Sequence, residues 1–130
     1  MNNKEIKCVI DSWQRINVQT EKACYHFFNC LFKKEPSLEP LFDTNSQAKQ
    51  RQYTNMLNLI VNGLEQINNL EESLQALGQT HKKYGATQSH YDAMRDSLIE
   101  TINHSCDEKL SEEEENAWGK AFDLFSKMMN

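Results

Sequence analysis

The stretch of sequence that decides the fold runs from residue 69 to residue 85 and reads NLEESLQALGQTHKKYG. Its apolar residues recur every three or four positions, which is the spacing of one face of an α-helix. Leu74, Leu77 and His81 lie on that face, and Tyr84 follows one turn later. The stretch therefore predicts an amphipathic helix that carries a histidine on the side facing the core.

Capping residues mark both ends of this helix and the start of the last one. Asn69 is expected to cap the start, with Glu72 three residues on to complete a capping box. Gly85 suits the left-handed conformation that commonly ends a helix. Ser111 and Glu114 form a second capping box, which predicts that the last helix begins there.

Helical spacing of apolar residues extends over almost the whole chain. Pro36 and Pro40 interrupt it, and because the residue before a proline is biased away from helix, they predict a corner with at most one short turn. The predicted main helices cover residues 6–16, 20–32, 49–64, 69–84, 89–102 and 111–128. We therefore expect an all-α chain of six main helices and one short corner helix, with residues 1–130 as a single domain.

The composition excludes several classes of protein. Of the 130 residues, 38% are hydrophobic, which is low for a soluble domain, although the apolar residues are clustered. The 14 Lys and Arg against 19 Asp and Glu give a net charge of −5, so we expect neither nucleic acid nor an anionic membrane as partner. No run approaches the roughly 18 apolar residues of a membrane span.

The N-terminus and the cysteines bear on the compartment. Residues 1–5 read MNNKE and hold no apolar signal core, so we expect a cytoplasmic protein. The four cysteines, at positions 8, 24, 30 and 106, form no CxxC pair. We therefore expect reduced and mostly buried thiols rather than disulfides.

His81 is the clearest candidate for chemistry. An imidazole on an apolar helix face needs a partner, because a buried polar group without one is costly. Two interpretations stay open at this point: a core histidine bonded to a backbone carbonyl, or the proximal ligand of a haem iron. His26, His90 and His104 lie near helix ends or at polar spacing, and no HxxxH, HExxH or Cys/His cluster predicts a zinc site.

Several short motifs follow one another in the order and spacing of one family. They are FFNCLF at 27–32, EP at 35–36, LF at 41–42, LGxxHxxYG at 77–85, SHY at 89–91 and AWG at 117–119. Together they resemble the haem globins, most of all the single-domain bacterial globins, with neuroglobin-like animal globins next. The resemblance extends from about Ile6 to Met128.

The resemblance implies a globin fold with haem b held in a pocket between helices. By position, His81 matches the proximal iron ligand, and Phe42 matches the phenylalanine that wedges against the haem face. Tyr91 matches a tyrosine that packs near the proximal histidine. The rest of the pocket would be lined by Leu77, Thr80, Met94 and Leu98.

The same alignment of positions assigns the distal side. Lys49 falls where His or Gln is usual, Tyr53 falls where a side chain overhangs the bound gas, and Phe28 falls where bacterial globins often have Tyr. A slip by one residue would place Gln50 at the distal position, although the apolar stripe of the helix favours Lys49. Three roles stay open for Lys49: pairing with a haem propionate, donating to a bound ligand, or binding iron as a sixth ligand.

The implied function is reversible binding of a diatomic gas (O2, NO or CO) for storage, delivery or buffering. Tyr53 is expected to donate a hydrogen bond to the gas, with Lys49 and Gln50 as the other candidates. We expect a monomer or weak homodimer, and we assign no catalytic residue. The alternatives are a nitric-oxide dioxygenase that receives electrons from a separate reductase, and a haem-based gas sensor.

Overall fold

The computed structural model describes residues 1–16, 20–42, 44–105 and 109–129, and these residues form helices and no strand. The α-helices are α1 (Asn3–Ile16), α2 (Thr20–Lys34), α3 (Ser46–Gly63), α4 (Glu71–Lys83), α5 (Gln88–Ser105) and α6 (Glu112–Met129). Two 3₁₀-helices, η1 (Pro36–Leu41) and η2 (Leu64–Leu70), lie on either side of α3. The predicted all-α class is confirmed, with the six main helices and the corner helix η1.

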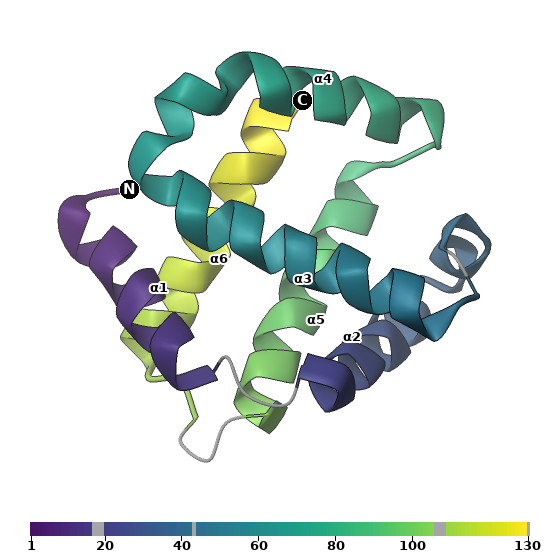
Figure 1. Ribbon diagram of the computed structural model, residues 1–130, viewed down its shortest axis with the longest axis horizontal. Coiled ribbons are helices and arrows are strands. Elements are labelled where there is room, and N and C mark those ends of the chain that lie inside the picture. Colours follow the sequence, from purple (N-terminus) through teal and green to yellow (C-terminus); the bar gives the residue numbers. More distant parts are fainter. Residues whose placement is uncertain (17–19, 43, 106–108, 130) are drawn as a thin grey trace.

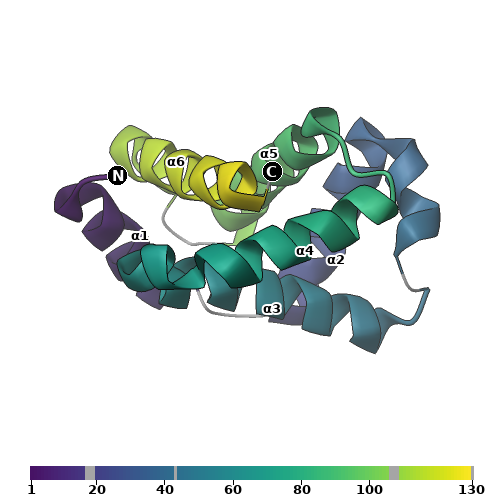
Figure 2. The same ribbon diagram turned by 90° about the horizontal axis from the view of Figure 1, so that it is seen from above.

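The helices cross one another in layers. Figure 1 shows α3 crossing over α5 and α6, and Figure 2 shows α5 and α6 on one side of the molecule with α3 on the other. The most extensive contact between helices joins α2 to α5, and both α1 and α4 pack against α6. In Figure 1, α3 and α4 meet at η2 and diverge toward their other ends. The later part of α4, which carries His81, therefore lies apart from the start of α3.

The core is centred on Trp118 of α6, which is fully buried. Its indole Nε1 donates a hydrogen bond to the Ser12 hydroxyl at 2.8 Å, and that hydroxyl donates to the Val9 carbonyl at 3.0 Å. These bonds satisfy buried polar atoms and join α1 to α6. Other large apolar side chains with almost no exposure are Phe27, Leu31, Leu74 and Leu98.

Side-chain caps begin several of the helices, among them α3 and α6. The Ser111 N–H donates to Glu114 Oε1 at 2.9 Å, and the Glu114 N–H donates to Ser111 Oγ at 3.1 Å, so the predicted capping box before α6 is confirmed. Asn45 caps α3, because its side-chain oxygen accepts from the Ala48 N–H at 3.0 Å. This cap starts α3 three residues before Lys49, where the apolar stripe alone began.

The predicted cap at Asn69 was wrong. Asn69 lies inside η2, and the residue that precedes α4, Leu70, makes no side-chain cap. In a 3₁₀-helix, residues three apart share a face. Ile67 and Leu70 share a face in this way, and Leu64, which precedes the non-helical residue Gln66, also packs on the core. The burial of these three side chains outweighs a cap at Asn69.

The predicted start of the fifth main helix at Ser89 was also displaced. The helix α5 begins at Gln88 and is capped by Thr87, whose hydroxyl oxygen accepts from the His90 N–H at 3.4 Å. The Thr87 N–H donates to His90 Nδ1 at 3.2 Å. The pair is reciprocal like a capping box, but histidine takes the place of the Glu or Gln by which such a box is recognised in a sequence.

The three described cysteines are free thiols, but only one of them is buried, whereas mostly buried thiols were expected. Cys24 is buried, and Cys8 and Cys30 are half-buried. Burial is the main cause that raises the pKa of the Cys24 thiol, so this thiol stays protonated. Cys106 lies outside the described residues. Within the part of the chain that the structure describes, we find no helix long and apolar enough to cross a membrane.

Candidate functional site

His81 lies in the turn that closes α4. The Gly85 N–H bonds to the Lys82 carbonyl at 3.0 Å, and the Ala86 N–H bonds to the His81 carbonyl at 3.0 Å, which together form a Schellman motif. Gly85 has the left-handed φ of +85° that this motif requires, as its position in the sequence predicted. The backbone of His81 is therefore held by the hydrogen bonds that end the helix.

The imidazole of His81 is half-buried, and its two nitrogens differ. Nδ1 lies 2.8 Å from the Leu77 carbonyl oxygen, and because a carbonyl can only accept, Nδ1 carries the proton. Nε2 makes no hydrogen bond with the described residues, and in the neutral ring it keeps its lone pair. The carbonyl bond expected of a core histidine is present, but it leaves the second nitrogen available as a metal ligand.

Tyr91 of α5 lies next to this imidazole. The two ring centroids are 6.3 Å apart, and the tyrosine is only 6% exposed. Its hydroxyl has no hydrogen-bond partner among the described residues, and burial raises its pKa, so it stays protonated. Burial of a donor without a hydrogen-bond partner costs about 1–3 kcal/mol of stability. A ligand near His81 that offers an acceptor to the Tyr91 hydroxyl would remove this cost.

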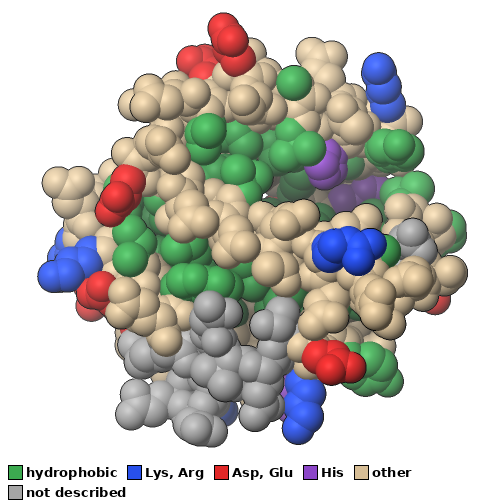
Figure 3. All heavy atoms as spheres, viewed as in Figure 1, with side chains coloured by type: hydrophobic (Ala, Val, Ile, Leu, Met, Phe, Trp, Pro, Cys, Tyr) green, Lys and Arg blue, Asp and Glu red, His purple; other side chains and the backbone are tan. Residues whose placement is uncertain are grey.

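The surface is hollowed between α3 and α4. Figure 3 shows this opening, with hydrophobic and histidine side chains at its border. Leu77 of α4 is 37% exposed, which is high for a leucine on the apolar stripe of a helix. Exposed apolar surface around a concave opening is typical of a binding site for an apolar ligand.

On the opposite side, Lys49 and Tyr53 lie one turn apart on α3. Tyr53 is only 4% exposed, and its ring centroid lies 5.1 Å from that of Phe27. Lys49 is half-buried, with Nζ 5.6 Å from the centroid of the Phe28 ring. Gln50 occupies the next position along α3 and is also half-buried. The structure thus brings Lys49 and Tyr53 against α2, where two adjacent phenylalanines lie.

An aromatic cluster joins α2 to the end of η1. The Phe28 ring lies 5.1 Å from Phe42 and 5.6 Å from Phe32, and Phe32 lies 5.8 Å from Phe42, all between centroids. Sequence reasoning singled out Phe28 and Phe42 but gave no site role to Phe27 or Phe32. The aromatic run at residues 27–32 was the signal that could have included them.

The other residues expected in the pocket lie in different surroundings. Met94 is half-buried and Leu98 is almost fully buried in the core. Thr80 is exposed, and its hydroxyl donates to the Ala76 carbonyl at 3.3 Å within α4. The structure thus places His81 beside Tyr91, Lys49 beside Phe28 and Tyr53 beside Phe27. Thr80 bonds back to its own helix.

Gly78 has a role that sequence reasoning did not assign. A Cβ atom added to Gly78 would overlap the backbone carbonyl of Met129, so α4 and α6 approach here backbone to backbone. A glycine inside a helix costs up to about 1 kcal/mol relative to alanine. Because a glycine destabilises the interior of a helix, its presence three residues before His81 was a signal in the sequence that another part of the chain packs closely against α4.

A second histidine cluster lies between α2 and α5. His26 and His104 stack with ring centroids 4.0 Å apart, and His26 Nδ1 lies 3.2 Å from Thr101 Oγ1 and 3.7 Å from Cys30 Sγ. Burial and then the charge of His104 lower the pKa of His26. No three His, Cys, Asp or Glu side chains of the described chain are arranged to hold a metal ion. We assign this cluster to the packing of α2 on α5.

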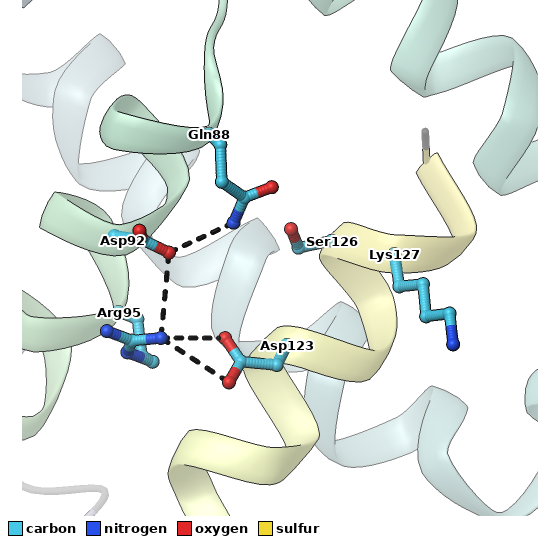
Figure 4. A pocket seen from close by; sticks show the side chains of 6 residues that line it. All are labelled: Gln88, Asp92, Arg95, Asp123, Ser126 and Lys127. Carbon is cyan, nitrogen blue, oxygen red and sulfur yellow. Dashed lines mark hydrogen bonds and ion pairs between the residues drawn. The ribbon is translucent and has the colours of Figure 1, made fainter.

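A polar pocket of about 220 Å³ lies between α5 and α6 (Figure 4). Arg95 Nη1 contacts Asp123 Oδ1 at 3.1 Å and Asp92 Oδ1 at 3.6 Å, and Gln88 Nε2 donates to Asp92 Oδ1 at 3.0 Å. The Arg95 Nε also donates to Asp96 Oδ1 at 3.1 Å, so the guanidinium is shared among three carboxylates. These contacts join two helices, and we assign them a structural role.

Comparison with known proteins identifies a family and curated relatives. The family model described as Globin matches residues 25–129, which is most of the chain and includes most of α2 and all of α3 to α6. Among the relatives, a protein of Gossypium hirsutum named as an anaerobic nitrite reductase is 30% identical over 130 residues, covering 88% of this chain and 80% of the relative. A protein of Casuarina glauca, also named as an anaerobic nitrite reductase, is 27% identical, covering 88% of this chain and 81% of the relative.

Solved structures match the fold over nearly the whole chain. A bacterial globin from Campylobacter jejuni has a TM-score of 0.79 at 18% identity, covering 98% of this chain and 93% of that one. The hemoglobin of the botfly Gasterophilus intestinalis has a TM-score of 0.81 at 20% identity, covering 99% and 96%. The fold implied by the sequence motifs is confirmed.

Proposed function

The chain belongs to the globin family, and on this premise we propose that it holds haem b between α3 and α4 and binds a diatomic gas reversibly. His81 is the iron ligand in this proposal. The observation that carries it is the hydrogen bond from His81 Nδ1 to the Leu77 carbonyl, which fixes the tautomer and directs the lone pair to Nε2. When bound, haem supplies an iron atom that takes a gas as its ligand.

The residues around His81 fit such a group. Haem combines an apolar macrocycle with charged propionates, and the opening between α3 and α4 has hydrophobic side chains at its border. The hydroxyl of Tyr91 has no partner among the described residues and would donate to an acceptor on the bound group. Phe42 is half-buried at the edge of the aromatic cluster, in position to pack against a flat ring.

Residues of α3 would act on the gas. A gas that gains negative charge when bound is stabilised by a nearby hydrogen-bond donor in a site with little water. Tyr53 is buried and is the donor we propose. Phe28 has no group that can donate a hydrogen bond. The centroid of its ring lies 5.6 Å from Lys49 Nζ.

A second candidate activity comes from the names of the plant relatives. Both are called anaerobic nitrite reductases, and Lys49 places a positive charge on the side of the pocket where an anionic substrate would bind. Such an activity, like nitric-oxide dioxygenation, requires electrons from a separate donor. We therefore propose gas binding as the function and redox chemistry as the alternative.

Replacement of His81 tests the proposal. Purified protein is titrated with haem, and absorption spectra are recorded in the ferric, ferrous and oxygen-equilibrated states. We expect wild type and His104→Ala to bind one haem and to change spectrum on addition of oxygen, because His104 belongs to the separate cluster on α5. We expect His81→Ala to lose this response. Normal haem and oxygen binding by His81→Ala would show that the iron ligand is another residue.

A further inference from the structure

Two histidines lie in the contact between α2 and α5, the most extensive contact between helices of the described chain. The His26 ring of α2 and the His104 ring of α5 stack face to face, with centroids 4.0 Å apart and planes 9° from parallel. His26 Nδ1 also lies 3.2 Å from the hydroxyl oxygen of Thr101, which is fully buried on α5. The His26 ring is therefore held between the two helices.

This stack accommodates one proton more readily than two. Two imidazolium rings at this separation repel each other, so the charge on one ring disfavours the charge on the other. Groups that interact in this way titrate as a coupled pair. Neutral rings have no such repulsion, so the protonation state of the stack determines how favourable the contact between α2 and α5 is.

The charges around the stack compensate a second proton poorly. Besides His104, the charged groups of the described chain that influence the pKa of His26 are Glu100 of α5 and Lys33 of α2. Lys33 opposes protonation of His26. Glu100 favours it, but its carboxylate already pairs with Lys34 Nζ at 3.3 Å.

A further titratable group against His26 is the Cys30 thiol, with Sγ 3.7 Å from Nδ1 and 3.9 Å from Nε2. Burial is the main cause that raises the pKa of this thiol, so it stays protonated and brings no negative charge. Burial is also the first cause that lowers the pKa of His26, followed by the charge of His104. His26 in the stack thus takes up a proton less readily than a separated ring, and acid favours separation.

The same turn of α2 carries aromatic residues of the proposed haem site. Phe27 and Phe28 follow His26 directly. The Phe27 ring lies 5.1 Å from that of Tyr53, and the Phe28 ring lies 5.1 Å from that of Phe42, both between centroids. A movement of α2 away from α5 would therefore displace rings that contact residues of the site.

We propose that the His26–His104 stack is a pH-sensitive switch that controls how firmly the protein retains haem. With neutral rings, α2 stays packed on α5. With both rings protonated, the imidazolium charges repel, α2 separates locally from α5, and the aromatic rings of α2 hold the haem less firmly. The inference rests on the proposed function, because it concerns the haem that His81 would bind.

The test is the rate of haem loss from the purified, haem-loaded ferric protein. Serum albumin in excess takes up the released haem, and absorption is the readout. The rate is measured at pH 7.5 and 5.5 in wild type, His26→Gln, His104→Gln and the double variant. Lys22→Gln is the matched control, because Lys22 is exposed on α2 and its loss removes a positive charge that is not part of the stack.

The quantity compared is the ratio of the two rates, pH 5.5 over pH 7.5. Uptake of one proton on opening changes the opening equilibrium by up to tenfold per pH unit, so we expect the ratio for wild type and Lys22→Gln to exceed that for His26→Gln about fivefold or more. His104→Gln should be intermediate, since it removes the repulsion but leaves His26 half-buried. The double variant should match His26→Gln, because His104 acts through His26.

The far-ultraviolet circular dichroism of the haem-loaded protein should be the same at both pH values, since only one contact between helices opens. A helical signal that falls together with haem loss would overturn the inference, because the whole chain would then be unfolding. Equal ratios in wild type and either single variant would also overturn it, and so would independent, additive effects of the two substitutions. If wild type takes up no haem, the proposed function fails and the inference fails with it. If wild type binds haem and gas but its ratio equals that of His26→Gln, only the inference fails.

Discussion

At the scale of single residues, the site depends on which atoms already have partners. The Nδ1 of His81 is committed to the Leu77 carbonyl, whereas Nε2 is not bonded to any described residue. The Tyr91 ring lies 6.3 Å from the imidazole, centroid to centroid, and its hydroxyl is buried without a partner among the described residues. Native proteins rarely leave buried donors unpaired, so a ligand that accepts from the Tyr91 hydroxyl is part of the function we propose.

Tyr53→Phe tests the proposed hydrogen bond to the gas. Removing one hydroxyl donor costs about 1 kcal/mol, so we expect the oxygen dissociation rate of the haem-loaded protein to rise about five- to tenfold. Stopped-flow measurement of oxygen release checks this. Tyr25→Phe is the matched control, because Tyr25 is 74% exposed on α2 and should leave the rate unchanged. An unchanged oxygen dissociation rate in Tyr53→Phe would show that Tyr53 is not the donor and would leave Lys49 or Gln50 as the candidates.

The His26–His104 stack predicts a dependence of stability on pH. Burial and the charge of His104 lower the pKa of folded His26 below its ordinary 6.5, with Glu100 acting in the opposite direction. The unfolded chain therefore binds the proton more readily, so the contribution of His26 is present above about pH 6.5 and is lost as the pH falls through that value. We expect the melting temperature to fall between about pH 7.5 and 5.5, and to fall less in His26→Gln.

In the His26→Gln variant, the glutamine side chain can still bond to the Thr101 hydroxyl, which lies 3.2 Å from His26 Nδ1 in the wild type. His104→Gln removes the neighbouring charge and should give an intermediate slope. Identical slopes of melting temperature against pH in wild type and His26→Gln would contradict this account of the cluster.

The residues of the site could be predicted from the sequence only in part. His81 stood out because a histidine on an apolar stripe needs a partner, and its assignment as iron ligand came from the family resemblance. Gly78 and Phe27 did not stand out, since their roles depend on contacts with Met129 and Tyr53, which are remote in the sequence. Periodicity identifies a helix face but not the residue that it meets.

At the scale of elements, α4 is fixed at both of its ends and against α6. Its last turn is closed by the Schellman motif at Gly85, and η2 leads into its first turn. Between them, Gly78 lets α4 lie directly on the backbone of Met129. Because His81 is one turn beyond Gly78, the approach of α4 to α6 sets the position of the imidazole.

Gly78→Ala tests the importance of this approach. The added Cβ would overlap the Met129 carbonyl, and overpacking of this kind costs about 1–3 kcal/mol. We expect urea denaturation to show a loss of that size in the free energy of unfolding, together with weaker haem retention because α4 must move. In the control, Gly119→Ala, the nearest atom to the new Cβ is Ile99 Cδ1 at 3.9 Å, so that variant should be neutral or slightly more stable.

Equal stability of the two alanine variants would mean that α6 moves at Met129 without a loss of stability.

Helix boundaries also show where prediction from the sequence is limited. The box at Ser111 was predicted correctly because its two partners are local, whereas the cap at Asn69 lost to the packing of Leu64 and Leu70 on the core. A capping pattern in the local sequence predicts the start of a helix correctly where the burial of apolar side chains does not favour a different start.

At the scale of the whole molecule, the low hydrophobic content of 38% has a physical counterpart. The divergence of α3 and α4 leaves an opening with hydrophobic side chains at its border, and Leu77 of α4 is 37% exposed. A haem in this opening would cover apolar surface that the chain itself leaves exposed, and burial of such surface is favourable by about 25 cal/mol per Å².

Stability should therefore depend on haem. A ligand that binds only the folded state at about 1,000 times its Kd stabilises that state by about 4 kcal/mol. We expect differential scanning calorimetry to give a melting temperature higher by about 10 °C or more for the haem-loaded protein than for the haem-free protein. Equal melting temperatures of the haem-loaded and haem-free protein would contradict the proposal that haem forms part of the core.

We propose that this chain binds a gas reversibly at a haem held by His81. The measurement that tests it most directly is the absorption spectrum of the haem-loaded ferrous protein through repeated cycles of oxygen addition and removal, with carbon monoxide as a second gas. The account predicts one haem per chain, a spectral change that titrates to one gas molecule per haem, and full return to the starting spectrum when the gas is removed. A protein that binds haem but gives the same spectrum with and without either gas would contradict it.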